Sequence, residues 1–179
     1  VRDNAAGVSN MDLLYAALAK RGVLYADLRV SLANAESLTY HKRDTHWNGE
    51  GARIAYNAIL DVLELSRDDF SAYPTIHTTD FSGDLDGMLY PGSEKTDDNY
   101  MPQYDFDSAF VYTSAGAAPM AMSLTTRSGG EGSLLVFRDS FGSSLVPLLV
   151  KDYTTVTVVD TRYMAPNFLK QYLEFDNQD

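Results

Sequence analysis

The 179-residue sequence contains no cysteine, and this absence excludes several kinds of chemistry together. Disulfide bonds, zinc–thiolate sites and cysteine nucleophiles all require the thiol group. The absence leaves the compartment open, because exported bacterial proteins and cytosolic proteins can both lack cysteine.

Basic residues and long apolar runs are also scarce. The chain has 14 lysines and arginines against 25 acidic residues, which gives a formal charge of −11. Because polyanions bind to concentrated basic surfaces and these basic residues do not cluster, we expect no nucleic acid partner. No run of about 18 apolar residues is long enough to cross a membrane, and the N-terminus has no signal-peptide pattern.

The apolar content is nevertheless sufficient for one domain. Apolar residues make up 45% of the chain, so we expect residues 1–179 to share a single core. The sequence starts at Val1 without an initiator methionine. We therefore interpret it as the C-terminal part of a longer chain, with a targeting segment upstream.

Periodicity predicts an alternating order of helices and strands. Helices are expected over residues 11–20, 50–65, 140–150 and 165–175, with Asn48 capping the second. Strands are expected over residues 23–28, 133–137 and 154–159, and a hairpin over residues 108–126. Residues 82–108 have no clear period and are expected to form a long functional loop or lid. Alternation of strands and helices is typical of the α/β class with a mainly parallel sheet.

Ser140 is the first candidate for chemistry. It follows the predicted strand "SLLVF" and precedes the predicted helix, in "FRDSFGSS". Ligands of open α/β sheets bind beyond the carboxyl ends of the strands, and unpaired N–H groups at a helix start can stabilise an oxyanion. Serine is equally a common helix N-cap, so this position alone does not choose between capping and catalysis.

The stretch "DTHW" supplies partners for such a serine. A serine nucleophile needs a base and an acid that orients the base, and His46 and Asp44 can fill these roles in any chain order. Two alternatives remain open. Asp44 and His46 are good metal ligands, although His41 and His77 show no convincing ligand spacing with them. His46 can also be a partly buried histidine without a function.

Three stretches together resemble the DHHW family and the SGNH-hydrolase-like domains of the alginate O-acetyltransferase type. Residues 43–57, "RDTHWNGEGARIAYN", are similar to the D-x-H-W block, and residues 137–163 are similar to the block whose D-S-F-G carries the nucleophile. Residues 81–89, "FSGDLDGML", match a weaker block between them. The sequence has Thr45 where the family name implies histidine, so we expect this middle residue not to be essential.

The resemblance implies a flavodoxin-like, three-layer α/β fold and a triad of Ser140, His46 and Asp44. It implies serine-dependent hydrolysis or O-acetyl transfer on an acetylated polysaccharide of the bacterial cell envelope or extracellular space. Neither a cofactor nor a metal is expected, whereas envelope proteins are possible partners. The alternative is a catalytically degenerate module that binds a glycan or serves as a scaffold.

Five further residues are candidates for contact with the substrate or the oxyanion. Trp47 can stack on a sugar ring or seal the start of a helix as a core residue. Arg138 can steady an anion or form a salt bridge with an aspartate at 139 or 160. Gly83 can lend a backbone N–H to an oxyanion hole or serve as a turn glycine. Arg162 and Tyr163 follow a predicted strand and either line the same crevice or pack.

Overall fold

The computed structural model describes residues 7–66, 68–112, 123–163, 167, 169–172 and 175. The helices are α1 (Asn10–Lys20), α2 (Arg29–Ala33), α3 (Gly49–Val62), α4 (Asp84–Leu89), α5 (Phe106–Ala109), α6 (Gly142–Val150) and α7 (Leu169–Tyr172). The strands are β1 (Thr75–Phe81), β2 (Asp97–Pro102), β3 (Phe110–Tyr112), β4 (Ser123–Ser128), β5 (Ser133–Arg138) and β6 (Thr155–Asp160).

A four-stranded sheet forms the main body, with the strand order β3-β4-β6-β5. Strand β5, helix α6 and strand β6 form a parallel unit in which Leu134 pairs with Val156. The α/β class is as predicted, but the expected mainly parallel sheet is wrong: the described β3–β4 and β4–β6 pairs are antiparallel. The reason is that β4 lies between β3 and β6 and runs in the opposite direction to both.

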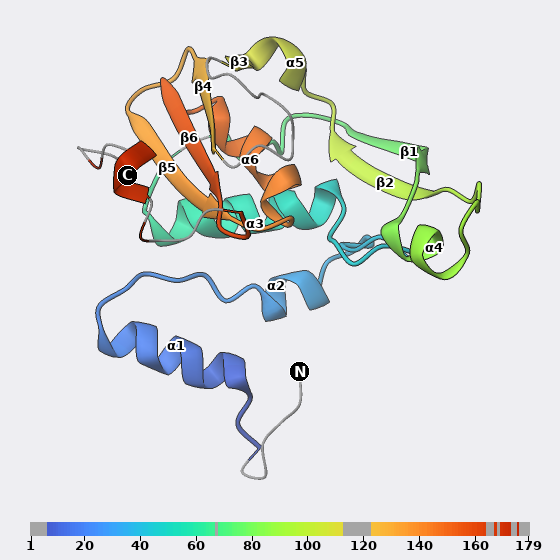
Figure 1. The fold of residues 1–179 in the computed structure, drawn as a ribbon, viewed down its shortest axis with the longest axis horizontal. Helices are drawn as coiled ribbons and strands as arrows, with labels where there is room; N and C mark the ends of the chain where they lie inside the picture. Colours follow the sequence, from blue (N-terminus) through green and yellow to red (C-terminus); the bar gives the residue numbers. More distant parts are fainter. Residues whose placement is uncertain are drawn as a thin grey trace.

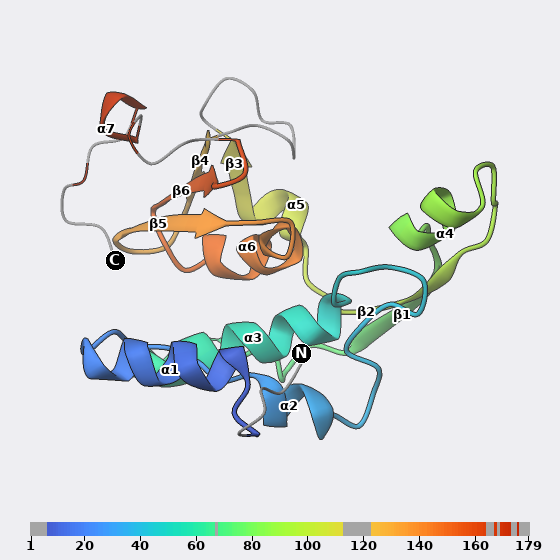
Figure 2. The same ribbon diagram turned by 60° about the horizontal axis from the view of Figure 1, so that its bottom comes forward.

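The core lies between this sheet and two stacked helices (Figures 1 and 2). Helix α6 packs on the sheet, and α3 packs on the other side of α6. The fully buried members of this core include Ala52, Tyr56 and Phe70 around α3, and Val150 and Val156 at the sheet. The predicted helix over residues 50–65 is confirmed as α3, and its buried residues lie along one face: Gly51, Ala52, Ala55, Tyr56 and Leu60.

A second, two-stranded sheet extends from the N-terminal end of α3 (Figure 1). Strands β1 and β2 pair antiparallel, and α4 lies at the far end of this arm. The prediction of an unstructured loop over residues 82–108 is therefore wrong, since α4, β2 and the start of α5 lie within it. The polar composition of these short elements hides their periodicity, and pairing between distant residues forms the strands.

The glycines of "WNGEG" allow α3 to start close to other backbone segments. A Cβ atom at Gly49 would lie 2.3 Å from the carbonyl oxygen of Tyr100, and one at Gly51 would lie 2.3 Å from that of Thr39. The Asn48 side chain caps the helix by accepting hydrogen bonds from residues 50 and 51, as predicted. These contacts fix the end of the preceding loop, which carries Asp44 and His46.

The N-terminal region differs in part from the prediction. Helix α1 forms as expected, and Ser9 and Asp12 make a capping box at its start. The predicted strand at residues 23–28 is wrong, because no described strand pairs with it and it runs as coil into α2. The predicted turn of the 108–126 hairpin lies outside the described residues. The predicted C-terminal helix over residues 165–175 is described only in part, and α7 (Leu169–Tyr172) lies within it. Over the described range, no helix has the length and apolar character needed to span a bilayer.

Candidate active site

Asp44 and His46 form a tight pair in the loop before α3. The Nδ1 atom of His46 lies 2.6 Å from Oδ1 of Asp44, and the His46 backbone N–H donates to the same oxygen at 2.8 Å. The Asp44 side chain is only 5% exposed, whereas that of His46 is 27% exposed. Asp44 thereby fixes the orientation of the imidazole ring and engages one of its two nitrogens.

Asp84, at the start of α4, supports this pair from the other side. Its backbone N–H donates to Oδ2 of Asp44 at 2.8 Å. In return, the Asp84 carboxylate accepts from the Thr45 backbone N–H at 3.0 Å and from the Thr45 hydroxyl at 2.6 Å. Asp84 was not a predicted site residue, although it belongs to the weaker block at residues 81–89.

The environment keeps Asp44 ionised. Burial raises the pKa of Asp44, but hydrogen bonds from the Asp84 and His46 backbone and from the His46 ring outweigh it. The pKa of Asp44 therefore lies below its ordinary value. An ionised acceptor on Nδ1 suits an orienting acid, because it stabilises a histidine that takes up a proton.

Asp97 anchors the beginning of the same loop to β2. Its buried carboxylate accepts backbone hydrogen bonds from Lys42 at 2.5 Å, Arg43 at 3.0 Å and Asp98 at 2.8 Å. Arg43 also forms an ion pair of 2.6 Å with Asp86 on α4. The loop is thus held between two elements that lie 40 to 55 residues further along the chain.

Gly83 lies against this loop and does not line the cavity at Ser140. A Cβ atom at Gly83 would come within 2.0 Å of the Arg43 carbonyl oxygen, so only glycine fits there without a shift of the backbone. The adjacent Leu85 N–H donates to that same oxygen at 3.2 Å. The structure therefore places Gly83 where it allows α4 to approach the Asp44 loop.

Ser140 lies in the turn between β5 and α6, as predicted. Helix α6 begins at Gly142 with Phe141 as its N-cap residue, and no side chain caps this end. Ser140 is therefore not the N-cap, which removes the capping alternative. Its hydroxyl makes no hydrogen bond within the described part of the chain, while the Asp139 carboxylate accepts from the Phe141 N–H at 2.9 Å.

Trp47 joins the two sides of the site. Its indole N–H donates to the Phe141 carbonyl oxygen at 3.1 Å and to the Ser144 hydroxyl at 3.0 Å. The Phe141 ring contacts both Trp47 and His46, with centroid distances of 5.2 and 5.0 Å. Trp47 is only 9% exposed, a placement that matches its reading as a core residue at the helix start.

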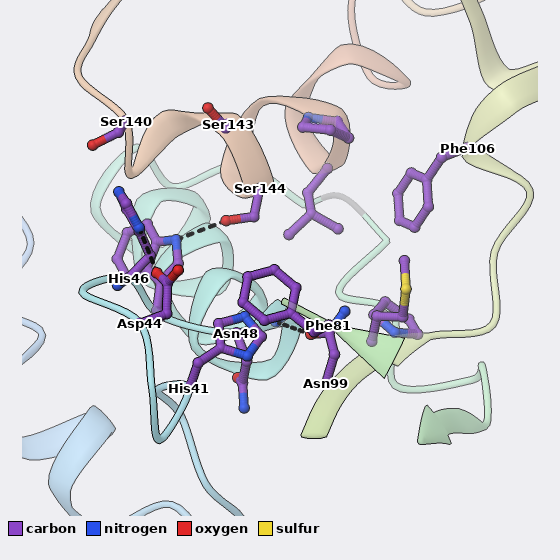
Figure 3. A pocket seen from close by; sticks show the side chains of 16 residues that line it. His41, Asp44, His46, Asn48, Phe81, Asn99, Phe106, Ser140, Ser143 and Ser144 are labelled. Atoms are coloured by element: carbon purple, nitrogen blue, oxygen red, sulfur yellow. Dashed lines mark hydrogen bonds and ion pairs between the residues drawn. The ribbon is translucent and has the colours of Figure 1, made fainter. Parts of the chain in front are cut away.

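Asp44, His46, Trp47 and Ser140 line one cavity of about 470 Å³. Figure 3 shows Asp44, His46 and Ser140 at one end of it, with the His46 ring between the other two, and Phe106 at the opposite end. Asn99, Met101, Pro102 and Phe106 also line it, so part of residues 82–108 borders the Ser140 site. The structure thus brings the three predicted triad residues to a common wall.

Arg138, Arg162 and Tyr163 lie outside the cavity lining. Both arginines form ion pairs with Asp160, which is fully buried, at 3.2 Å for Arg138 and 2.6 Å for Arg162. Hydrogen bonds from Arg162 lower the pKa of Asp160 against the effect of burial. Arg138 also donates to the Asp139 carbonyl oxygen at 3.1 Å. Its side chain thus connects the Ser140 turn to the buried Asp160.

A metal is the remaining alternative for the loop. Among the described residues, Asp44, His46 and Asp84 form one group with potential ligand atoms within 4.8 Å of one another. The Nδ1 atom of His46 is bonded to Asp44, and the Asp84 oxygens accept from Thr45. The hydrogen bonds therefore orient the His46 ring through Nδ1 and engage both acidic side chains of this group.

Comparison with known families identifies the class. The family described as "SGNH hydrolase-like domain, acetyltransferase AlgX" matches residues 1–119, more than half of the chain. The chain therefore belongs to this family, and the predicted resemblance is confirmed. The matched range contains the Asp44 loop and the α4 block and ends before Ser140. No protein of curated function matches the sequence.

Solved structures share the fold. A DHHW family protein from Eubacterium siraeum superposes with a TM-score of 0.64 at 22% identity, covering 92% of this chain and 66% of that one. PatB1 from Bacillus cereus gives a TM-score of 0.53 at 17% identity, covering 78% and 59%. PatB1 with a sulfonyl adduct gives 0.51 at 16% identity, covering 74% and 56%. The chain spans less than two thirds of each, and at these identities the likeness shows the SGNH-like α/β fold.

Proposed function

We propose that this protein is a serine-dependent acyl-ester enzyme that removes or transfers O-acetyl groups on a polysaccharide. Its nucleophile is Ser140, its general base His46 and its orienting acid Asp44. The observation that carries the proposal is the 2.6 Å bond between His46 and Asp44 beside Ser140 in one cavity. Membership of the SGNH hydrolase-like acetyltransferase family supports the same chemistry.

The first half of the reaction forms an acetyl-enzyme. The Ser140 Oγ attacks the carbonyl carbon of the acetyl ester while Nε2 of His46 accepts the hydroxyl proton. As the carbon–oxygen bond to the sugar breaks, the protonated His46 returns this proton to the leaving sugar oxygen. Asp44 stabilises the transient imidazolium through Nδ1.

The turn offers one backbone donor for the oxyanion. The N–H groups of residues 141, 142 and 143 are already bonded to Asp139 or to Ser140. The N–H of Ser140 itself makes no hydrogen bond within the described residues, so we assign it as a donor to the oxyanion. A preorganised donor of this kind typically contributes about 10²–10³-fold in rate.

The second half decides between hydrolase and transferase. Water or a sugar hydroxyl attacks the acetyl-Ser140 carbonyl while His46 takes its proton. As the bond from the acetyl carbon to Ser140 Oγ breaks, His46 returns this proton to Oγ. Membership of a family described as an acetyltransferase favours transfer. We place the reaction at the bacterial cell envelope or outside the cell, where acetylated polysaccharides occur.

A labelling experiment tests the nucleophile directly. Treatment with an arylsulfonyl fluoride should add one sulfonyl group to Ser140, located by peptide mass spectrometry, and should abolish turnover of a chromogenic acetyl ester. PatB1 with a sulfonyl adduct makes this reagent a fitting probe. Ser140→Ala should remain unlabelled, and Ser66→Ala, at an exposed coil position, should behave as the unaltered protein. No label and no turnover would favour the glycan-binding module.

Acetyl transfer is tested on the same acyl-enzyme. After loading from a chromogenic acetyl ester, acetate release should be slow in water and faster in the presence of an oligosaccharide acceptor, with formation of the acetylated sugar. Rapid acetate release that no glycan alters would identify a hydrolase instead.

A further inference from the structure

The cavity at Ser140 is much larger than an acetyl group. Its volume is about 470 Å³, whereas a group the size of the acetyl methyl fills roughly the 30 Å³ that one water molecule occupies. Ser140 and the catalytic pair lie at one end only (Figure 3). Most of the cavity therefore lies beyond the place where an acetyl group would sit.

The lining changes from polar to apolar away from Ser140. One face of α6 shows this change, since Ser143 and Ser144 are followed one turn later by Pro147 and Leu148. The opposite wall continues the apolar end, which is lined by Phe81, Met101, Pro102 and Phe106.

The polar residues near the apolar end already have protein partners. His41 bonds the Asp98 carbonyl oxygen at 3.0 Å and stacks on Phe81, and Asn99 accepts from the Gly49 N–H at 3.2 Å. Asn48 is engaged by the helix cap and by the Leu38 carbonyl oxygen at 2.6 Å. A sugar ring placed there would bury hydroxyls with few partners, at a high desolvation cost.

The charge of the cavity lining also limits which ligands can bind. Among the described lining residues there is no lysine or arginine, so a carboxylated acyl group or a uronate would find no counter-ion. A neutral alkyl chain needs neither hydrogen bonds nor a counter-ion. Continuity with Ser140 places such a chain on the acyl side of the scissile ester.

We infer that this cavity is an acyl pocket that accepts neutral acyl chains of about four to eight carbons. The inference rests on the proposed function, because the pocket acts only if Ser140 is acylated. The carbonyl carbon sits at Ser140 while the chain runs along α6 towards Met101 and Phe106. Acetyl is then a substrate that leaves most of the pocket unfilled.

A series of p-nitrophenyl esters tests the inference, because the leaving group stays constant. From acetyl to hexanoyl, kcat/KM should rise by roughly fourfold for each methylene that the pocket buries. Met101→Trp narrows the apolar end and should lower the hexanoyl-to-acetyl ratio of kcat/KM by about tenfold or more. Met88→Trp is the matched control, because Met88 is 72% exposed on α4 and lies outside the cavity.

A second measurement does not depend on turnover. Hexanesulfonyl fluoride should label Ser140 faster than methanesulfonyl fluoride in the unaltered protein, and Met101→Trp should remove this difference. Met101→Ala widens the pocket and serves if the tryptophan variant does not fold, with a preference shifted towards octanoyl. Thermal melts establish which variants are folded.

The possible failures can be told apart. If Ser140 is labelled and acetyl esters are turned over, but kcat/KM falls steadily with chain length, the acyl pocket is wrong and the proposed function stands. An unchanged chain-length ratio in folded Met101→Trp also overturns the pocket. If no ester is turned over and no sulfonyl group is added, the proposed function itself fails.

Discussion

The loop that carries Asp44 and His46 is held by distant elements, whereas the turn that carries Ser140 is held mostly by its own neighbours. Asp97 on β2 and Asp84 on α4 bond the loop from both sides. Several bonds of the Ser140 turn lie within residues 138–143. Its contacts from outside this range come from Trp47 to Phe141 and from the neighbouring end of β6 to Arg138. The position of the proposed base thus depends on tertiary structure, whereas the position of the proposed nucleophile follows mainly from a strand, a tight turn and a helix.

This difference has a consequence for substitutions. Changes around the loop should alter the position of the base before they alter the nucleophile, since acidic side chains far along the chain set that position. Changes at the turn should act locally.

The largest expected effect removes either partner of the chemistry. Ser140→Ala and His46→Ala should each lower acetyl-ester turnover by about 10⁴-fold or more, and the double variant should be no worse than the single ones. The free energy of unfolding of Ser140→Ala should be close to that of the unaltered protein. The Ser140 hydroxyl makes no hydrogen bond within the described residues and does not cap α6. Steady-state kinetics and thermal melts measure both quantities. Additive losses in the double variant would contradict a joint role.

The next largest effect should come from the support of the base. Asp84→Ala removes the acceptor of two Thr45 hydrogen bonds and lets the loop shift, so kcat should fall by roughly 10- to 100-fold while KM changes little. Asp84→Asn retains an acceptor oxygen and should recover part of the rate. Thr45→Val removes only the hydroxyl bond and should cost less than Asp84→Ala. An equal loss in kcat with a tenfold higher KM would instead point to direct substrate contact.

Asp97 gives a pH-dependent contribution to stability. Burial raises its pKa, but backbone hydrogen bonds from Asp98, Arg43 and Lys42 hold it below the ordinary value of 3.8. Its contribution is therefore present above that value and is lost as the pH falls through the lower pKa of the folded state. Asp97→Asn should reduce the free energy of unfolding by about 1–3 kcal/mol at pH 7.

Denaturant unfolding at several pH values measures this contribution. The difference between Asp97→Asn and the unaltered protein should shrink once the pH falls below the pKa of the folded-state carboxyl. A difference that stays constant from neutral to strongly acidic pH would show that ionisation of Asp97 is irrelevant.

The smallest effect separates the two readings of Trp47. Trp47→Phe retains an aromatic ring but removes both indole hydrogen bonds, so stability should fall by about 1 kcal/mol and kcat modestly. The KM for an oligosaccharide acceptor should not change. A raised acceptor KM without loss of stability would instead support stacking of the sugar on the indole.

The sequence predicts the elements whose signal is local. Helix α3, its Asn48 cap and the β5–α6 turn with Ser140 follow from short-range patterns, and the structure contains them. Strands β1 and β2 were missed because "TIHTTDF" and "DDNYMP" are largely polar and exist through pairing with each other. The apolar segment at residues 23–28 failed for the opposite reason, since a strand also needs a partner strand.

The candidate site divides in the same way. Asp44, His46 and Ser140 were predicted from the chemistry of their side chains, and the family resemblance linked the two stretches. Asp84 and Asp97 were not predicted, because an aspartate that accepts a hydrogen bond from a backbone N–H has no distinct sequence pattern. Only the folded arrangement shows which of the 25 acidic residues support the base.

The hydrogen bond from the Trp47 indole to the Phe141 carbonyl oxygen joins residues that are 94 positions apart in the sequence. The bond from the Lys42 N–H to Asp97 joins residues that are 55 positions apart. Contacts between residues so far apart in sequence carry a large loop-closure entropy and form late when a chain folds. The helices α3 and α6 can therefore be present before the site is. During synthesis, the Asp44 loop leaves the ribosome long before its partner at residue 141, so the unfinished chain carries a histidine without its serine. The proposed reactive centre is complete only once the chain has been made beyond Ser140 and has folded.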